Sequence, residues 1–287
     1  MTSGPVRHAQ VIGDPIEHSK SPIIHGFWLE KLGLTHLYAA AHLKSEDLAD
    51  YLGAAKDYPY WLGCNVTMPH KQAVIPYLAE MSDVARKIGA VNTIYLSERG
   101  LYGTNTDAAG FLEPLAGELA QTHYFRMARI LGTGGAARAI IVALAEHGFT
   151  LVLAGRDPDK ARALLDELAP EGDHYAVHLD HFAQPTDFAF DDREGCLDLV
   201  VNASPLGMTG HPPLAFDWSH APPGSIAYDI VTNPFDTDFL KQARASGHRT
   251  IDGLAMLVGQ AAAAFEMFFG QPPPREHDAE LMELLRQ

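Results

Sequence analysis

The stretch ARILGTGGAARAIIVALAEHG, residues 128–148, contains the pattern that decides the fold. Gly132, Gly134 and Ala137 match the spacing G-x-G-x-x-A, between a predicted strand and a predicted helix. In this motif the first glycine permits a tight turn, the second lets backbone amides approach a pyrophosphate, and the third small residue lets helix pack on strand. A second strand signal follows at 151–154. The stretch therefore predicts a Rossmann-type dinucleotide-binding fold.

The end of that second strand should select the dinucleotide. It reads Gly155-Arg156-Asp157. An arginine there accommodates the extra phosphate of NADP, whereas an acidic residue hydrogen-bonds the ribose hydroxyls of NAD. Asp157 has a second reading as the cap of a helix that begins near Pro158. We expect NADP rather than NAD, and the adjacent aspartate leaves the preference open.

Strand and helix signals alternate along the whole chain, which is typical of an α/β protein with parallel sheet. We expect an N-terminal α/β substrate domain, then the Rossmann-type domain, with the C-terminal helices packing back on the first domain. The predicted boundaries are residues 1–107 plus 253–287 for the substrate-binding and catalytic domain, and 108–252 for the dinucleotide-binding domain. Further strands of the parallel sheet are predicted at 175–179, 197–203, 226–231 and 249–251.

Two local predictions concern the first domain. Ser21 is placed to cap a helix that has Pro22 in its first turn and runs to about Leu32. Pro69 follows the strand at 61–68 and is expected to open a helix towards Leu78.

Composition excludes several functional classes. The chain of 287 residues is long enough for two domains, and its formal net charge of −15 argues against a nucleic-acid partner. The apolar run at 254–269 is too short for a membrane span. Two cysteines far apart, Cys64 and Cys196, indicate reduced thiols and a cytoplasmic protein. A homodimer is an assembly that the sequence leaves open.

A metal site is not expected. His174, His178 and His181 are close in sequence, yet the chain has no HExxH motif and this segment reads as polar surface.

The stretch GCNVTMPHKQAV, residues 63–74, raises the question of function. It places Asn65, Thr67 and Lys71 at the end of a strand that otherwise reads as buried. Two more polar segments, around Asn92 and Asp107, flank a predicted hairpin. Taken singly each group has a structural explanation, such as a cap, a strand end or a solvated helix face.

Together, eight segments closely resemble the shikimate dehydrogenase family. They occur in family order over nearly the whole chain: VIGDPIEHSKSPIIH (11–25), GCNVTMPHK (63–71), GAVNT (89–93), NTDAAG (105–110), LGTGGAARA (131–139), NASPLGM (202–208), AYDIV (227–231) and IDGLAMLVGQAAAAFE (251–266). The resemblance implies reversible NADP-dependent reduction of 3-dehydroshikimate to shikimate, a step towards chorismate and the aromatic amino acids.

The resemblance also implies roles for residues that match the family motifs. Lys71 would be the acid/base residue, with Asp107 beside it. The implied substrate-binding residues are Ser19, Ser21, Asn65, Thr67, Lys71, Asn92, Asp107, Thr232 and Gln260. The implied cofactor-binding residues are Asp83, Gly132, Thr133, Gly134, Gly135, Ala136, Arg138, Gly155, Arg156, Ile230, Gly253 and Met256.

One departure from the family pattern keeps the substrate open. Thr232 stands where the family usually has a tyrosine that touches the substrate. A quinate/shikimate dehydrogenase with NAD or mixed cofactor use is therefore the first alternative, and a catalytically silent dinucleotide-binding sensor is the second. A lysine within reach of the substrate oxygen can both give and take its proton. All enzymatic readings therefore place Lys71 at the site, with its ammonium group beside the Asp107 carboxylate that would orient it.

Overall fold

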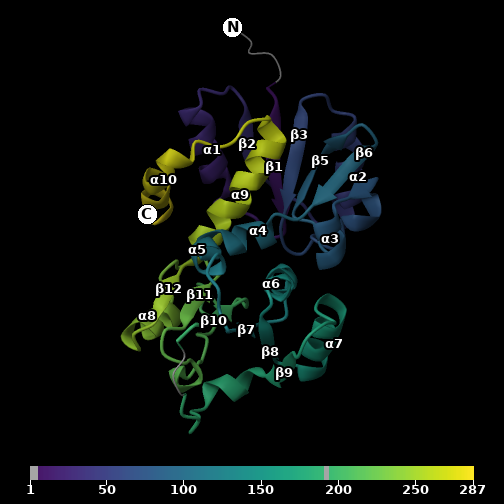
Figure 1. The fold of residues 1–287 in the computed structure, drawn as a ribbon. Coiled ribbons are helices and arrows are strands. Elements are labelled where there is room, and N and C mark those ends of the chain that lie inside the picture. The colour runs from purple at the N-terminus through teal and green to yellow at the C-terminus, as the bar shows by residue number, and fades with distance from the viewer. Residues whose placement is uncertain (1–5, 191–193) are drawn as a thin grey trace. The chain divides into compact units, whose positions relative to one another are not determined.

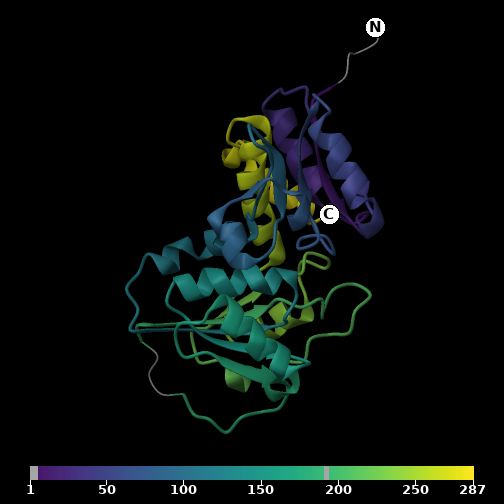
Figure 2. The ribbon, with the colours of Figure 1, turned by 90° about the vertical axis from the view of Figure 1, so that its right-hand side faces the viewer.

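The computed structural model describes residues 6–190 and 194–287. Its chain divides into two compact units (Figures 1 and 2). The first unit contains the chain up to Gly110 together with Val258–Gln287, and the second contains Phe111–Leu257. Each unit is built around one sheet of six strands. The separate roles predicted for the two domains stay predictions.

The first unit has a mixed sheet in the order β2-β1-β3-β5-β6-β4. The three strands β1, β2 and β3 are parallel, whereas β5 and β6 form an antiparallel hairpin. Because β1 and β3 run parallel, the chain segments that follow both strands leave the sheet at the same edge. The strands are β1 (His8–Gly13), β2 (Leu37–His42), β3 (Trp61–Val66), β4 (Glu80–Met81), β5 (Thr93–Ser97) and β6 (Gly100–Thr104).

Helices α1, α2, α3 and α10, with the later part of α9, complete the first unit. A Cβ atom at Gly63 would lie 2.5 Å from the Phe268 ring, so α9 packs directly on β3. Helix α10 contacts α1, and Lys20 Nζ donates to the Leu285 carbonyl at 2.7 Å. The predicted return of the C-terminal helices is confirmed. The bounds of these helices, and of α4 at the end of the unit, are α1 (Ser21–Lys31), α2 (Leu48–Lys56), α3 (Asp83–Ile88), α4 (Asp107–Leu112), α9 (Gly253–Phe269) and α10 (Asp278–Leu285).

Two local predictions for this unit are wrong. The segment after Pro69 forms successive turns and one 3₁₀ turn, Ile75–Tyr77, instead of an α-helix. Pro76 lies inside the expected helix, where it has no N–H to donate to a carbonyl four residues earlier and its ring would clash with that carbonyl. Ser21 is the first residue of α1 and not its cap; the capping position is Lys20, and among the described side chains none caps this helix end.

An aromatic cluster fills the space between α1, β2 and α9. His25 is fully buried in it, with its ring stacked 3.9 Å from the Tyr38 ring and 5.8 Å from the Phe265 ring. Neither ring nitrogen of His25 has a hydrogen-bond partner among the described residues. Burial lowers the pKa of His25 to about 3 from 6.5. The folded chain therefore holds this imidazole neutral.

His25→Phe is expected to remove an acid-sensitive part of the stability. The folded pKa lies below the unfolded one, so this stability is present above about pH 6.5 and is lost as pH falls, by up to about 1.4 kcal/mol per pH unit. From about pH 7 to about pH 5, the free energy of unfolding should fall by about 2 kcal/mol more in the native chain than in the variant. Denaturant unfolding of both at the two pH values measures the difference, and parallel losses would contradict the assignment.

The second unit has an all-parallel sheet in the order β12-β11-β10-β7-β8-β9. The chain starts in the middle at β7, adds β8 and β9 on one side, and then crosses to add the other three strands on the opposite side. This doubly wound order confirms the predicted Rossmann-type domain, and ligands of such sheets bind where the order reverses. The strands are β7 (Phe125–Leu131), β8 (Thr150–Gly155), β9 (Tyr175–His178), β10 (Cys196–Asn202), β11 (Ile226–Asp229) and β12 (Arg249–Ile251).

Helices connect these strands, and Figure 1 shows α6 and α7 beside β8 and α8 beside β12. Helix α6 is almost wholly apolar on the side facing the sheet, with Ala137, Ile140 and Leu144 fully buried. Phe239, Leu240 and Ala243 of α8 join a core cluster with Phe182, because Ala243 lies three and four residues after the other two and so shares their helix face. The bounds are α5 (Ala116–Leu119), α6 (Gly135–Glu146), α7 (Pro158–Leu168) and α8 (Asp238–Ala245).

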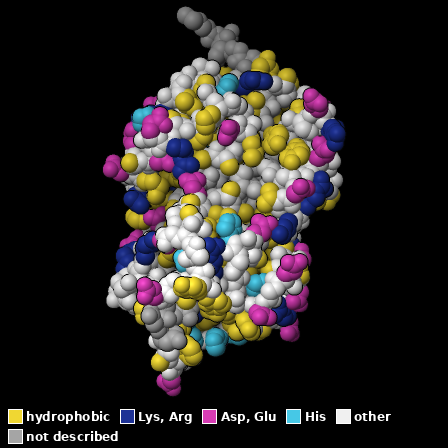
Figure 3. Space-filling view, in the orientation of Figure 1, with side chains coloured by type: hydrophobic (Ala, Val, Ile, Leu, Met, Phe, Trp, Pro, Cys, Tyr) yellow, Lys and Arg dark blue, Asp and Glu magenta, His cyan; other side chains and the backbone are white. Residues whose placement is uncertain are grey.

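On the face drawn in Figure 3, Lys and Arg side chains are interspersed with Asp and Glu side chains. Within the described parts of the chain, every helix is too short or too polar to cross a membrane.

Candidate active site

The centre of the candidate site is an ion pair in the first unit. Lys71 Nζ donates to Asp107 Oδ2 at 2.5 Å. The lysine side chain is 16% exposed and the aspartate side chain 7%, so the pair is largely shielded from bulk water while one side stays accessible. The convergence of these two groups, on which the enzymatic reading depends, is confirmed.

Backbone contacts place both members of the pair. Lys71 lies in the turns after β3, and the Val91 N–H donates to its carbonyl at 2.7 Å. Asp107 is the first residue of α4, directly after the polar segment that ends β6. Asn92 Nδ2 donates to Asp107 Oδ1 at 2.8 Å, so one carboxylate oxygen is held by the amide and the other by the lysine.

Asn65 and Asn92 are saturated with internal hydrogen bonds. Asn92 Nδ2 also donates to Thr106 Oγ1 at 3.0 Å, and the Thr106 N–H donates to Asn92 Oδ1 at 2.8 Å. Asn65 Nδ2 donates to the Asn92 carbonyl and to Thr93 Oγ1, while its Oδ1 accepts from Tyr38. Both side chains are nearly fully buried. These bonds favour a positioning role, and their predicted contact with substrate stays a prediction.

The other predicted substrate residues of the first unit lie at different depths. Thr67 is half-buried, and its methyl group lies so close to Gly13 that a Cβ there would come within 2.5 Å. Ser19 is half-buried and accepts from the Ser21 N–H at 3.3 Å. Ser21 and Gln260, on α1 and α9, are buried with 6% and 8% exposure. Their contacts with a substrate remain predictions.

Sequence reasoning assigned no individual role to several members of this network. Tyr38 lies on β2, and its hydroxyl donates to Asn65 Oδ1 at 2.6 Å. Thr93 Oγ1 links Asn65 to Asn92, and Asn105 bonds the Ala90 carbonyl. Burial raises the pKa of Tyr38, while a hydrogen bond from Ser21 opposes that rise, so the hydroxyl stays a donor. The NT pairs at 92–93 and 105–106 were the available signal, but Tyr38 sits in an alanine-rich strand with no comparable marker.

The arrangement supports proton transfer. An ammonium group has three donor hydrogens, and only one of those of Lys71 points to Asp107. The remaining hydrogens can reach a substrate oxygen, while the carboxylate orients the side chain and balances its charge.

The close packing around the glycine turn of the second unit explains why its residues have small side chains or none. Gly132 has φ +124°, and a Cβ there would lie 2.8 Å from the carbonyl carbon of Ala203. Gly132 thus allows the segments that follow β7 and β10 to approach each other at the point where the strand order reverses. Gly155 is likewise close to Thr133, whose Cγ2 would lie 2.9 Å from an added Cβ.

The start of α6 fits a pyrophosphate. Gly134 and Gly135 are exposed, and among the described atoms none comes within 4 Å of a Cβ built at either position. The protein itself therefore does not require glycine there, whereas a ligand that lies against the backbone would. None of the described side chains caps this helix end, so its first amides are available to an anion.

The residues after β8 separate the two readings of the cofactor. Asp157 Oδ1 accepts from the backbone N–H groups of Asp159 and Lys160 at 3.0 and 3.1 Å, so the carboxylate caps α7. Arg156 is exposed, and its guanidinium makes no ion pair or hydrogen bond with any described residue. This geometry leaves the arginine available to a phosphate and occupies the aspartate elsewhere.

The remaining predicted cofactor residues fall into two groups. Arg138 is buried on α6 and forms an ion pair with Glu167 of α7, which lowers the pKa of that glutamate. Its place at a pyrophosphate stays a prediction, as does that of Asp83, an exposed residue at the start of α3 in the first unit. Ala136 follows Gly135 in α6, and the other predicted cofactor residues lie after β11 and in α9: Ile230, Gly253 and Met256. Thr232, a predicted substrate residue, also lies after β11, and its contact with substrate stays a prediction.

A buried carboxylate holds the segment after β11. Asp229 is fully buried and accepts from the Val231 N–H at 3.0 Å, from Asn202 Nδ2 at 3.0 Å and from the Thr237 hydroxyl at 2.6 Å. Burial raises its pKa to about 6 despite these donors. Gly253 packs beneath the same segment, since a Cβ there would lie 2.5 Å from the Ile230 carbonyl oxygen.

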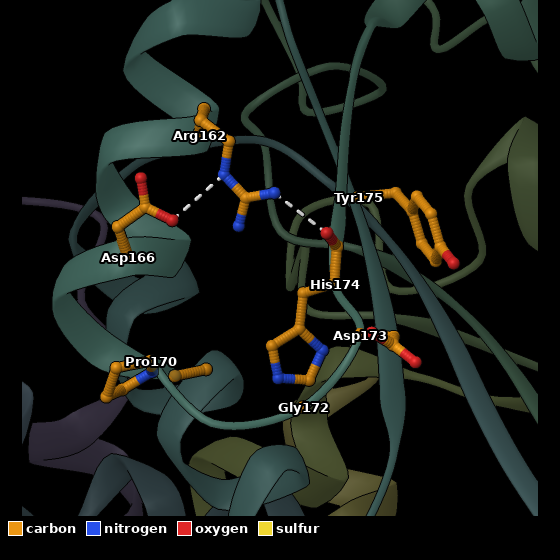
Figure 4. Close-up of a pocket in the computed structure, with 8 residues that line it drawn as sticks. Arg162, Asp166, Pro170, Gly172, Asp173, His174 and Tyr175 are labelled. Atoms are coloured by element: carbon orange, nitrogen blue, oxygen red, sulfur yellow. Dashed lines mark hydrogen bonds and ion pairs between the residues drawn. The ribbon is translucent and has the colours of Figure 1, made fainter.

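A hollow of about 360 Å³ lies at the amino end of β9, away from the glycine turn (Figure 4). Arg162 donates to the His174 carbonyl at 2.8 Å and pairs with Asp166 at 3.0 Å, so the guanidinium is engaged within the hollow. The glycine turn follows the carboxyl end of β7, which is the opposite edge of this sheet. Over the described ranges, no group of three or more His, Cys, Asp or Glu side chains is arranged to hold a metal ion.

Comparison with known families gives two matches. Residues 11–94 match the shikimate dehydrogenase substrate binding domain, and residues 253–283 match the shikimate 5'-dehydrogenase C-terminal domain. The NADP(+) shikimate dehydrogenase of Sphingopyxis alaskensis is 48% identical over 96% of both chains. That of Thermosynechococcus vestitus is 39% identical, covering 95% of this chain and 93% of its own.

Similar solved structures belong to the same family as the sequence relatives or are dehydrogenases of a related substrate. A shikimate dehydrogenase in complex with NADP+ superposes with a TM-score of 0.83 at 30% identity, covering 100% of this chain and 98% of its own. The enzyme of Thermus thermophilus with NADP(H) and shikimate gives 0.79 at 35% identity, with 98% and 100% covered. Quinate dehydrogenase from Corynebacterium glutamicum with NAD gives 0.78 at 31% identity, with 97% and 99% covered.

Proposed function

The chain belongs to the shikimate dehydrogenase family, and we propose that it catalyses the reversible NADPH-dependent reduction of 3-dehydroshikimate to shikimate with Lys71 as its acid/base residue. The observation that carries the residue assignment is the shielded Lys71–Asp107 ion pair among buried amides. The enzyme is an NADP-dependent oxidoreductase acting on a CH–OH group, in the route to aromatic amino acids. A cytoplasmic location and a homodimer stay predictions.

In the proposed mechanism, the glycine turn at Gly134 and Gly135 and the exposed Arg156 would hold NADPH, which would supply a hydride to the carbonyl carbon of the substrate. The electron pair of the carbonyl π-bond moves to its oxygen, and Lys71 donates a proton there to give the alcohol. In the reverse direction, neutral Lys71 takes the hydroxyl proton. Asp107 keeps the lysine side chain in place and offers an acceptor to a neighbouring substrate hydroxyl.

Substrate choice should rest on the polar groups of the first unit. Ser19, Ser21 and Thr67 are the side chains proposed to bind the carboxylate and ring hydroxyls of the substrate. A site built to hydrogen-bond hydroxyls rejects analogues that lack them, because its own polar groups would be left unpaired. Thr232 is the observation behind the alternative of quinate as a substrate.

Product analysis tests the proposed reaction. The purified protein with 3-dehydroshikimate and NADPH should form one shikimate for each NADPH consumed, as quantified by chromatography and absorbance. A protein that binds NADPH but forms no shikimate would contradict the enzyme assignment and favour the sensor alternative.

Cofactor preference has its own test. Arg156→Ala is expected to raise the KM for NADPH about 10- to 100-fold and leave that for NADH nearly unchanged, since a hydrogen bond to a charged group is worth about 1.5–3 kcal/mol. The matched control is Asp157→Asn, because asparagine also caps helices well and Asp157 is engaged in capping α7. Initial rates of each variant with NADPH and with NADH show which residue selects the cofactor. If the control shifts the preference and Arg156→Ala does not, the aspartate is the selecting residue.

A further inference from the structure

A buried side chain outside the proposed machinery ties together the two segments that carry the ion pair. Asn105 is 5% exposed and lies just after β6. Its Nδ2 donates to the Ala90 carbonyl at 3.0 Å, and its Oδ1 accepts from the Asp107 N–H at 2.9 Å. Both partners are backbone groups, one only an acceptor and the other only a donor, so they fix the orientation of the amide.

Both hydrogen-bond partners of Asn105 lie in segments that hold the Lys71–Asp107 ion pair in place. The Asp107 N–H is the backbone of the carboxylate residue itself. Ala90 precedes Val91, whose N–H holds the Lys71 carbonyl, and Asn92, whose side chain holds the Asp107 carboxylate. Asn105 therefore sets the separation between the segment at 90–92 and the start of α4. Loss of its side chain would let the carboxylate shift relative to the ammonium group.

We propose that Asn105 is a positioning residue for proton transfer, which acts by fixing Asp107 and the 90–92 segment relative to Lys71. The proposal rests on the proposed function, since it assigns Asn105 a part in the same reaction. It gives Asn105 no contact with substrate. A displacement of about 1 Å in a catalytic group can cost about 100-fold in rate, so a positioning defect should be large enough to measure.

Asn105→Ala tests the proposal, with Asn105→Ser as a partial rescue. The alanine variant should lower kcat about 10- to 100-fold while the KM for shikimate changes much less. The pH profile of kcat should change as well, because the carboxylate that orients the proton-transferring lysine would no longer be held in place. Serine keeps an acceptor that the Asp107 N–H can reach, so it should recover part of kcat.

Tyr51→Phe is the matched control, because Tyr51 makes two side-chain hydrogen bonds in the same unit, with Gln10 at 2.8 Å and Trp61 at 3.2 Å. It should lower the unfolding midpoint and leave kcat and its pH profile unchanged. Asn105 variants that behave like this control would overturn the proposal. If Asn105→Ala does not fold, the serine variant decides, because its shorter side chain cannot span the Ala90 carbonyl and the Asp107 N–H together and should still lower kcat. An unchanged kcat and pH profile in that variant would overturn the proposal. A native chain with no shikimate activity would instead refute the proposed function.

Discussion

Lys71→Met is expected to lower kcat by about 10²- to 10⁴-fold, the usual contribution of a positioned acid or base. Methionine keeps the length of the side chain and removes the proton donor. Binding of shikimate should remain detectable, since the remaining hydroxyl and amide groups are untouched. Steady-state rates in both directions, with calorimetric binding of shikimate, measure the two effects separately.

The control for this variant is Lys56→Met, which removes an exposed lysine at the end of α2 in the same unit. It should leave kcat unchanged. Removing the cation also leaves Asp107 without its ionic partner, which costs about 3 kcal/mol when such a pair is buried. The unfolding midpoint is therefore recorded for the same samples. A folded Lys71→Met protein with nearly native turnover would remove the lysine from the mechanism.

Gly134→Ala should separate cofactor binding from folding. The added methyl group would meet none of the described atoms within 4 Å, and the backbone at Gly134 (φ −83°) is allowed to alanine. In the bound state, however, the methyl group would stand between the pyrophosphate and the first amides of α6. Loss of two charged hydrogen bonds costs at least about 3 kcal/mol, which corresponds to about a 100-fold rise in Kd.

The matched control is Gly117→Ala on α5, where an added Cβ likewise meets no described atom within 4 Å. Both variants should unfold near the native midpoint. Only Gly134→Ala should weaken NADP binding, as followed by calorimetric titration. Native affinity in that variant would mean that the pyrophosphate does not lie against the glycine turn.

The second unit was the more predictable from sequence, and the reason is physical. A parallel sheet buried by helices repeats the same local unit, so the signals at β7, α6 and β8 each have one interpretation. The Gly132 turn also requires a residue type that few other conformations require. Asp157 shows the limit of this reasoning, because an aspartate before a proline is both a cap signal and a ribose signal, and only the contacts with Asp159 and Lys160 distinguish them.

The first unit was predicted less well because long-range contacts determine its details. The lysine and the aspartate at its centre are separated by 36 residues, and their meeting depends on the pairing of β3 with β5 and of β5 with β6. Pro69 was expected to open a helix, yet Pro76 prevents it. Tyr38 was not singled out and Asn105, though part of a polar segment, received no role, because hydrogen bonds to distant strands leave no spacing pattern in the sequence.

The central claim is that this chain oxidises shikimate with NADP, and the most direct measurement is a matrix of kcat/KM for shikimate and quinate, each with NADP and with NAD. The contacts of Arg156 and Asp157 predict values with NADP at least about tenfold above those with NAD, and membership of the family predicts a higher value for shikimate than for quinate. An equal or higher value for quinate with NAD, or no reduction of either cofactor by either substrate, would contradict it.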